Sequence, residues 1–467
     1  MAARPARASP SPSPVPGRCG VSTTLSPSPS AIDPERWPDV ASVPSASAAR
    51  RWATERLLRR AVAQLPLWVR LPDGELLGRG GPLMEIRDPR AFHARLGRTG
   101  LIGFGESYLA GEWDAPDLVA VLTVLASEMA TLVPAPLQRL RGVWAARQPG
   151  AQRNTPSGSK RNISRHYDLS NDLFALFLDS TLSYSSGIFR SLPATPDRLT
   201  DAQHRKIDRL LDLAEVGPGT RVLEIGTGWG ELAIRAAARG ARVTSVTLSE
   251  EQRALALSRI AAAGHRDAAT VELCDYREVT GEYDAVVSVE MIEAVGVEYW
   301  PTYFAKLADV LAPGGRVALQ AITMPHERML ASRRTHTWIQ KYIFPGGMLP
   351  STEAVAEQAA PRLEITRRAG FGPHYAETLR LWREAFAARA EEVGELGFDE
   401  TFRRMWTFYL AYSEAGFRSG YLDVQQFLLT APGTPDAPAT PDAPGTPDAP
   451  ATPAGQARSD STEEPTP

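Results

Sequence analysis

The chain has 467 residues with 51 basic and 54 acidic side chains, a balance that produces no strong electrostatic field for nucleic acid. Twenty of its 39 prolines lie in residues 1–48 and 431–467. These segments contain too little apolar surface to offset the entropy of ordering, so both are predicted to be disordered tails. The middle, residues 49–430, exceeds one typical domain of about 100–200 residues, and two domains are expected.

The cysteine content and the hydropathy limit the cellular setting. The two cysteines, Cys19 and Cys274, exclude a disulfide framework and a thiolate zinc site, and no metal site is predicted. No apolar run approaches the ~20 residues of a membrane span, and the amino terminus lacks the apolar core of a signal peptide. We therefore expect a cytoplasmic protein that meets the inner face of the membrane only peripherally.

The first part of the middle segment has the pattern of a small α+β domain, assigned to residues 49–147. Short apolar stretches such as 67–71 are broken by turn signals, among them Pro72-Asp73-Gly74. Residues 148–160 are polar and contain glycine, which predicts a linker before the second domain, 161–430. A chain trimmed to residues 50–430 is expected to fold, because the removed segments lack core-forming residues.

The second domain alternates apolar strands with helical segments. Its strand-like runs are 221–225, 241–247, 270–273, 283–289 and 315–322. This alternation predicts an α/β fold, a doubly wound Rossmann-like parallel sheet. Residues 325–430 are predicted to be mostly helical. One helix there has an aromatic face that includes Phe402, Trp406 and Tyr409, interpreted first as core packing and second as a wall of an acyl tunnel.

A glycine-rich turn follows the first strand of this sheet, with Gly226, Gly228 and Gly230 in a G-x-G-x-G spacing. Glycines at a strand-to-helix turn allow the backbone to approach a ligand closely. Glu231 occupies the third glycine position of a dinucleotide-binding fingerprint, which argues against NAD. Glu224, just before the turn, places a carboxylate beside a ligand that carries a cation or an amine.

The ends of the next two strands have polar residues that allow two interpretations each. Thr247, Ser249 and Gln252 follow the second strand, where such sheets address a ribose, but Ser249 also suits a helix N-cap with Gln252 completing a capping box. Asp275 ends the third run, in position to accept a hydrogen bond from an adenine amine. An aspartate there is otherwise a turn former.

These features together resemble the class I S-adenosylmethionine-dependent methyltransferases, and several motifs narrow the resemblance. Segments 105–114, 166–172, 182–185, 291–296 and 342–347 are similar to motifs of the cyclopropane-fatty-acyl-phospholipid synthase family, which includes mycolic acid modifying enzymes. The resemblance covers about residues 50–430. It implies S-adenosylmethionine as cofactor and the acyl chain of an unsaturated phospholipid as substrate.

The resemblance also implies roles for particular residues. Its cofactor contacts fall on Tyr184, Ser185, Glu224, Gly226, Gly228, Gly230, Thr247, Ser249, Gln252, Asp275 and Tyr276. Its catalytic region falls on Glu293 and Tyr375, which in the family synthases surround a bicarbonate that serves as base. Three positions depart from the pattern. Ser186 replaces a cysteine, Gln320 replaces a histidine and Glu290 replaces a glycine, which puts the use of bicarbonate in doubt.

The sequence leaves open which product the enzyme forms, a cyclopropane or a methylene group. Methyl transfer to a double bond produces a carbocation, which must then lose a proton. If the proton leaves the new methyl group as a ring closes, the product is a cyclopropane. If a hydride shifts first, loss of the proton gives a methylene group that a reductase partner can convert to a methyl branch. Glu290 is hypothesised to favour the methylene product. A solvated or salt-bridged strand-end glutamate is the alternative. Because Glu290 and Glu293 are three residues apart, they share a face only if the segment is helical.

Two other classes of function stay open: a methyltransferase for a small amine or hydroxyl compound, and a lipid-binding protein without catalysis. Retained Glu293, Tyr375 and the glycine turn favour the enzyme. A homodimer is a further expectation that the sequence does not test.

Overall fold

The computed structural model of the protein describes residues 32–128, 170–333, 335–360 and 362–434. The predicted linker and most of both predicted tails lie outside these residues. By their internal contacts, the described residues up to Pro432 form one compact unit. The boundary between the two predicted domains therefore stays a prediction. None of the helices in the described ranges combines the length and the apolarity needed to cross a membrane.

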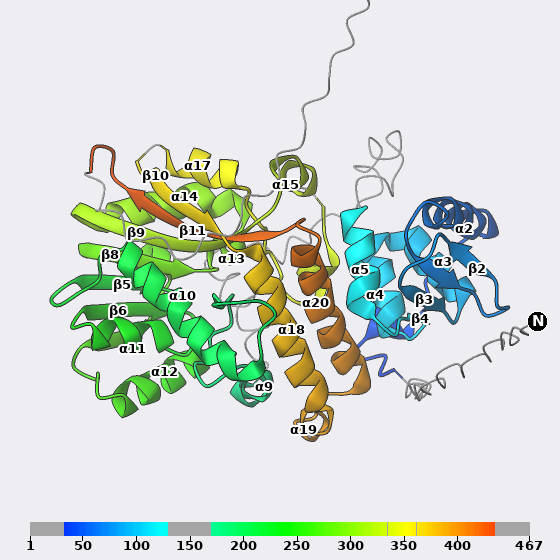
Figure 1. The fold of residues 1–467 in the computed structure, drawn as a ribbon, viewed down its shortest axis with the longest axis horizontal. Coiled ribbons are helices and arrows are strands. Elements are labelled where there is room, and N and C mark those ends of the chain that lie inside the picture. Colours follow the sequence, from blue (N-terminus) through cyan, green and yellow to red (C-terminus); the bar gives the residue numbers. More distant parts are fainter. Residues whose placement is uncertain (1–31, 129–169, 334, 361, 435–467) are drawn as a thin grey trace, which may run out of the picture. The chain divides into compact units, whose positions relative to one another are not determined.

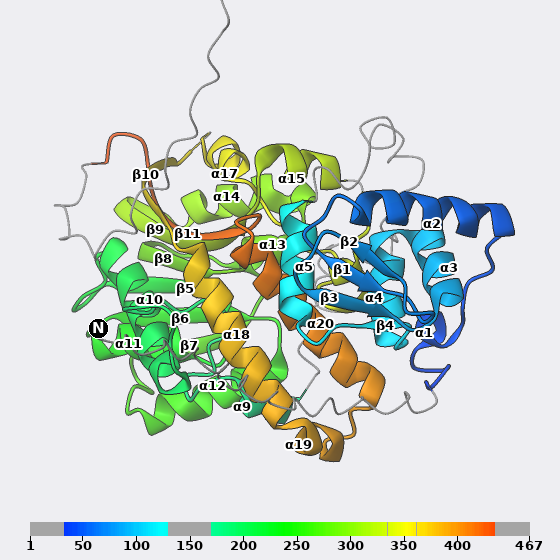
Figure 2. The same cartoon turned by 45° about the vertical axis from the view of Figure 1, so that its right-hand side comes forward.

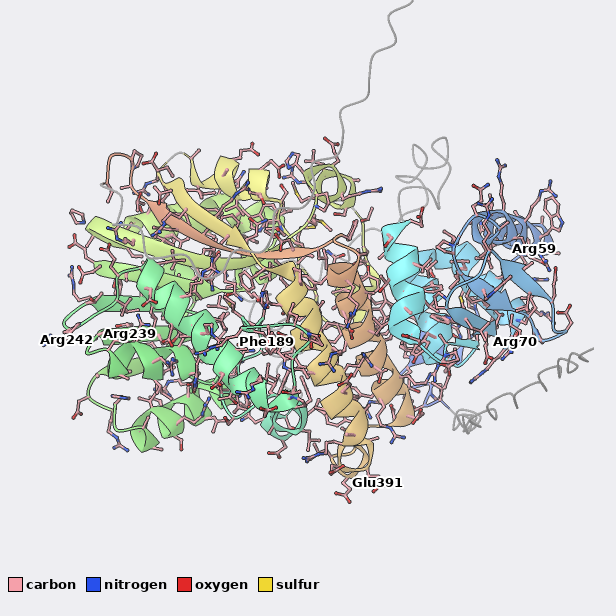
Figure 3. All side chains as sticks on the ribbon, viewed as in Figure 1. Arg59, Arg70, Phe189, Arg239, Arg242 and Glu391 are labelled. Carbon is pink, nitrogen blue, oxygen red and sulfur yellow. The ribbon has the colours of Figure 1, made fainter. Side chains whose placement is uncertain are left out.

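The amino-terminal elements build a four-stranded sheet in the order β2-β1-β3-β4, with helices packed around it (Figure 1, blue and cyan). Its strands are β1 (Trp68–Arg70), β2 (Leu76–Gly78), β3 (Leu83–Ile86) and β4 (Trp113–Asp114), and its helices are α2 (Ala48–Val62), α3 (Pro89–Thr99), α4 (Leu101–Leu109) and α5 (Leu118–Ser127). β1 and β2 form a hairpin around Gly74, as the turn signal predicted. The surface arginines Arg59 and Arg70, labelled in Figure 3, pair with Glu75 and Glu85.

The predicted end of the amino-terminal tail at residue 48 is wrong, because part of this segment is packed. Helix α1 (Pro38–Ala41) buries Val40, and Trp37 before it is 8% exposed. The indole of Trp37 donates to Asp399 Oδ2 at 2.8 Å. The buried guanidinium of Arg95 donates to the carbonyl oxygens of Asp39 and Val40 at 2.5 and 2.6 Å. Proline-rich composition concealed this contribution, because two apolar side chains and two carbonyls suffice to anchor a short segment.

Trimming the chain at two positions is therefore expected to show that residues 32–48 of the predicted tail contribute to stability and that residues 1–31 do not. A chain that begins at Ile32 should keep the free energy of unfolding of the full chain, whereas one that begins at Arg50 should lose roughly 3–5 kcal/mol, the usual cost of deleting a buried aromatic side chain. Its Arg95 also loses two acceptors. Urea unfolding of both chains measures the difference. Equal stability would show that residues 32–49 contribute nothing to the fold.

The second sheet has seven strands in the order β10-β11-β9-β8-β5-β6-β7. β5 (Arg221–Ile225), β6 (Arg242–Thr247), β7 (Ala269–Leu273), β8 (Tyr283–Val289) and β9 (Leu311–Thr323) pair in parallel, which confirms the predicted strands and the Rossmann-like fold. The central strands are buried on both faces. Val222, Leu223 and Ile225 are at most 1% exposed, which is why these strands are nearly continuous apolar runs in the sequence.

Helices connect and cover these strands. They are α10 (Leu199–Leu213), α11 (Glu231–Ala238), α12 (Glu250–Ala262), α13 (Ile292–Val295), α14 (Trp300–Asp309), α15 (His326–Ser332), α16 (Trp338–Tyr342), α17 (Thr352–Ala359), and the 3₁₀ turns η2 (Pro196–Arg198), η3 (Tyr276–Glu278) and η4 (Val297–Tyr299). Helix α9 (Asn171–Phe177) precedes them in the chain.

Two strands were missed in the segment predicted to be mostly helical. β10 (Glu364–Gly370) and β11 (Asp423–Thr430) extend the sheet, and β11 pairs antiparallel with both β9 and β10. β10 is polar and lies at the sheet edge, so it lacks the apolar run that marked the other strands. β11 inserts beside β9, more than 100 residues away in the chain. Its position therefore depends on tertiary pairing.

The helices between these strands confirm the rest of that prediction. They are α18 (Gly372–Ala388), α19 (Ala390–Glu395) and α20 (Glu400–Arg418). The aromatic face of α20 is core: Phe402, Trp406 and Tyr409 are at most 5% exposed. α20 packs against α18, which contacts the seven-stranded sheet, and against α4 and α5 beside the four-stranded sheet (Figures 1 and 2). It therefore connects the helices of the two sheets.

Candidate active site

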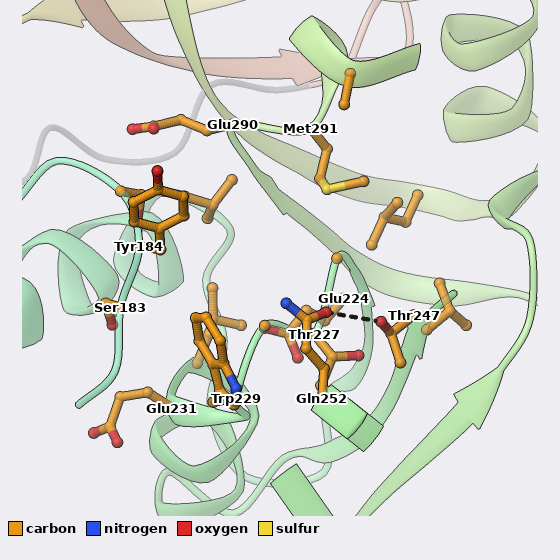
Figure 4. A pocket seen from close by; sticks show the side chains of 18 of the residues that line it. Ser183, Tyr184, Glu224, Thr227, Trp229, Glu231, Thr247, Gln252, Glu290 and Met291 are labelled. Atoms are coloured by element: carbon orange, nitrogen blue, oxygen red, sulfur yellow. Dashed lines mark hydrogen bonds between the residues drawn. The ribbon is translucent and has the colours of Figure 1, made fainter. Parts of the chain in front are cut away.

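A pocket lies at the carboxyl ends of β5, β6, β7 and β8, where parallel α/β sheets bind ligands. Nine of the predicted cofactor residues line it: Tyr184, Ser185, Glu224, Gly226, Gly228, Thr247, Gln252, Asp275 and Tyr276. Gly230 and Ser249 are not among its lining residues. Figure 4 shows Glu290 and Met291 on one side of the pocket and Trp229 and Gln252 on the other.

The glycines of the turn have different roles. Gly228 has φ +52°, and a Cβ placed on it meets no atom within 4 Å, because it faces the open pocket. A Cβ on Gly230, at φ +89°, lies 3.1 Å from the Cβ of Ala256 on α12. Gly228 thus leaves room for a ligand, whereas Gly230 allows α11 to begin close to α12.

Glu224 supplies the buried carboxylate that its position before the turn predicted. Its side chain is 3% exposed, and its Oε2 accepts a hydrogen bond of 2.5 Å from Ser245 Oγ. Burial raises the pKa of Glu224 to about 8. Burial outweighs the Ser245 hydrogen bond and the nearby charge of Lys206, which both favour the ionised form. A bound amine or cation would add a further favourable partner, so this wall fits S-adenosylmethionine, which carries both.

The structure decides part of what the sequence left open for the polar residues after β6 and β7. Ser249 caps α12 by accepting from the Gln252 backbone N–H at 3.2 Å, as the N-cap interpretation predicted. The predicted capping box is wrong, because the Ser249 N–H donates to Thr247 Oγ1 and the Gln252 side chain accepts from Thr247. Asp275 lines the pocket, and its carboxylate is held by Arg277 at 2.6 and 2.8 Å.

Lys206 of α10 also lines the pocket, and sequence analysis missed it. It is 2% exposed, and its Nζ donates to Ser185 Oγ at 2.7 Å. Burial lowers its pKa to about 8, although the nearby carboxylates, first Glu290, oppose that shift. The available signal was its position: Lys206 occupies the same helical face as Ile207 and Leu210, where a lysine is unusual.

The structure brings three of the four predicted catalytic residues together around Glu290. Glu290 Oε1 accepts from Gln320 Nε2 at 2.8 Å and from the Ser186 backbone N–H at 3.1 Å, and its Oε2 accepts from the Tyr375 hydroxyl at 2.7 Å. The interpretation of Glu290 as a solvated strand-end residue is therefore wrong. The residue has φ +53° in the turn between β8 and α13, which directs its side chain to these donors.

Glu293, the fourth predicted catalytic residue, lies in α13 near this cluster but has separate partners. Its Oε1 accepts from the Ile322 backbone N–H at 2.5 Å. Its Oε2 is buried and has no hydrogen-bond partner among the described residues. Burial, and next the charge of Glu290, raise the pKa of Glu293 to about 8. Both causes favour the protonated form of Glu293, which permits two neighbouring carboxyl groups in one region.

Aromatic side chains continue the wall beyond Glu290. The hydroxyls of Tyr184 and Tyr409 lie 2.8 Å apart, and the ring of Tyr184 packs 5.3 Å from that of Trp382. The Tyr375 ring packs 4.6 Å from Phe417. The region beside the carboxylate is therefore apolar and aromatic, as a substrate with a hydrocarbon chain requires.

The fold and this pocket together define a class I S-adenosylmethionine-dependent methyltransferase, and comparisons with known proteins identify the family. The family model described as mycolic acid cyclopropane synthetase matches residues 154–427. Tuberculostearic acid methyltransferase UfaA1 of Mycobacterium tuberculosis is 56% identical over 426 residues, 89% of this chain and 100% of that protein. The cyclopropane-fatty-acyl-phospholipid synthase of Escherichia coli K12 is 32% identical over 381 residues, 78% of this chain and 93% of that protein.

Solved structures agree with this assignment. The cyclopropane synthase MmaA2 of Mycobacterium tuberculosis has a TM-score of 0.54 and 34% identity, covering 58% of this chain and 97% of its own. The mycolic acid cyclopropane synthase CmaA1 complexed with SAH and CTAB has a TM-score of 0.53 and 32% identity, covering 60% and 98%. The chain belongs to the mycolic acid cyclopropane synthetase family, which confirms the resemblance found in its motifs. It is an S-adenosylmethionine-dependent enzyme.

Proposed function

We propose that the protein methylates the double bond of an unsaturated fatty-acyl chain of a phospholipid and releases a methylene-branched chain, the precursor of a 10-methyl fatty acid. The observation that carries this proposal is the Glu290 carboxylate, which accepts three hydrogen bonds beside the cofactor pocket. The relative that is 56% identical is named for tuberculostearic acid, a methyl-branched fatty acid, which supports the same product.

The chemistry requires a proton acceptor, and in this chain we assign that role to a protein side chain. S-adenosylmethionine, when bound, supplies the methyl group that adds to the double bond. The acyl chain then carries a positive charge, and the aromatic wall around Tyr184 and Tyr375 stabilises a cation while it excludes water. One proton must leave. The Glu290 carboxylate is the anionic acceptor in this wall, and the proton that it takes leaves an electron pair for the new carbon-carbon double bond.

The same carboxylate argues against bicarbonate. The resemblance implies an anion bound near residues 186, 320 and 375. Here Ser186, Gln320 and Tyr375 all donate to Glu290, so the side chain takes the hydrogen bonds that an external anion would need. The residues therefore do not fit a bound bicarbonate, and we assign it no step.

A cyclopropane product is the second candidate, because the family model is described by that activity and the Escherichia coli relative is named for it. The two products differ in whether a hydride shifts before the proton leaves. A carboxylate beside the cation lengthens its lifetime and so favours the shift. A reductase partner would then complete the methyl branch.

The site of action is proposed to be the inner membrane surface, since the acyl chain must leave a phospholipid layer to reach the pocket. Flotation with phospholipid vesicles tests that association. The expectation of a homodimer is tested by light scattering.

The direct test is the lipid composition of a bacterial host that expresses the protein and is fed a mono-unsaturated fatty acid. We expect phospholipid acyl chains heavier by one carbon and two hydrogens. Ozonolysis should cleave the bond to the methylene carbon and leave a ketone within the intact chain, because a methylene group is an alkene and a cyclopropane is not. Mass gain with ozone resistance would favour the cyclopropane product, and no mass gain would contradict both candidates.

A further inference from the structure

Gln426 of β11 is a buried amide that contacts Gln320, the side chain that donates to the proposed base Glu290. The proposed reaction assigns Gln426 no role. It is 1% exposed and lies directly opposite Gln320 in the pairing of β11 with β9. Its Nε2 donates to two acceptors, the Gln320 Oε1 at 3.0 Å and the Lys206 backbone carbonyl at 3.2 Å.

These two contacts determine which way both amides face. A backbone carbonyl only accepts hydrogen bonds, so the Gln426 atom that meets the Lys206 carbonyl must be its nitrogen. The same nitrogen meets Gln320, which must therefore present its oxygen. The nitrogen of Gln320 is then left to face Glu290 Oε1, at 2.8 Å. If the Gln320 amide were reversed, its oxygen would face the carboxylate, and two acceptors would be opposed.

We propose that Gln426 is a positioning residue that sets the orientation of Gln320 and thereby supplies Glu290 with an N–H donor. This inference rests on the proposed role of Glu290 as the base. The Gln426 side chain acts only through Gln320, since no hydrogen bond joins it to Glu290 among the described residues.

The consequence is a dependence of the rate on pH. The groups that face Glu290 are Lys206 from α10, Tyr375 from α18 and Glu293 from α13, besides Gln320 from β9 and the Ser186 backbone N–H. Burial raises the pKa of Glu290, whereas Gln320, Tyr375, the Ser186 N–H and Lys206 lower it. A base must be ionised. Losing the Gln320 donor raises the pKa further, so the acid limb of the pH profile of kcat should move to higher pH.

The test replaces Gln426 by methionine, which keeps the length of the side chain and removes both hydrogen bonds. We expect the acid limb of kcat to move up by about one pH unit, equivalent to a tenfold lower rate below that limb. The affinity for S-adenosylmethionine should not change. Gln425→Met is the matched control: Gln425 is the next residue of β11, and its Nε2 bonds Thr323 and Thr352 instead. Its pH profile should match that of the parent.

Two further variants keep the inference decidable. Gln426→Asn retains a polar amide and is expected to fold even if the methionine variant does not. Its shorter side chain cannot span both acceptors, so the limb should move in the same direction. In a Glu290→Gln background, Gln426→Met should cause no further shift.

A folded Gln426 variant with the parent's pH profile would overturn the inference. If Glu290→Gln itself kept the parent's rate and product, the proposed role of Glu290 as the base would fail instead, so the two failures are distinguishable.

Discussion

Glu290→Gln is expected to reduce turnover on an oleoyl phospholipid by ~10²–10⁴-fold, the usual loss for one well-placed acid-base group, and to lower the share of methylene product in what is formed. Glutamine keeps the size of the side chain but removes both the negative charge and the proton acceptor. The three donors that converge on Glu290 would then face an amide whose nitrogen cannot accept.

The measurement is steady-state turnover together with product analysis by mass spectrometry after ozonolysis. Glu298→Gln serves as the control, because Glu298 lies in η4, a few residues along the chain, and is exposed to solvent. Calorimetric affinity for S-adenosylmethionine and the thermal midpoint should be retained in both variants. An unchanged rate and an unchanged methylene-to-cyclopropane ratio in Glu290→Gln would make Glu290 a bystander.

Gly228→Val is expected to abolish measurable binding of S-adenosylmethionine and with it all turnover. Gly228 lines the pocket, and a side chain on it projects into open space that the cofactor needs. Its φ of +52° also strains a β-branched residue, at a cost of about 1–3 kcal/mol.

A control must separate that strain from the blocked space. Gly219→Val provides it, because Gly219 has φ +81°, a Cβ there also meets nothing within 4 Å, and it is not among the pocket-lining residues. Both variants should lose a similar amount of stability, but only Gly228→Val should lose the calorimetric signal of cofactor binding. Full affinity in a folded Gly228→Val protein would exclude this pocket as the cofactor site.

The sequence by itself determined the central sheet and the location of its pocket. β5, β6, β8 and most of β9 are buried, so each appears as an apolar run bounded by turn residues, and local pattern is sufficient to find it. β7, at the sheet edge, instead alternates buried and exposed residues, which is also a strand pattern. The glycine turn was recognisable for a similar reason: Gly226 and Gly228 have positive φ, a requirement that acts on single residues and leaves a direct trace in the sequence.

Only the tertiary structure decided what lies around Glu290. Ser186, Glu290, Gln320 and Tyr375 come from four separate parts of the chain, and no spacing encodes that their donors converge on one carboxylate. The sequence left Glu290 undecided between a surface residue and a reactive one, because burial depends on the elements packed over it. Lys206 and Gln426 were missed on the same ground.

The ends of the fold were likewise decided by packing. Trp37 and the carbonyls of Asp39 and Val40 are ordered by Asp399 and Arg95, partners that are distant in the chain. β11 is a strand because β9 presents a free edge to it, and Gln426 faces Gln320 only in that register. Long-range pairing of this kind depends on the whole assembled sheet, which is why local sequence pattern located the pocket but not the arrangement of its proposed base.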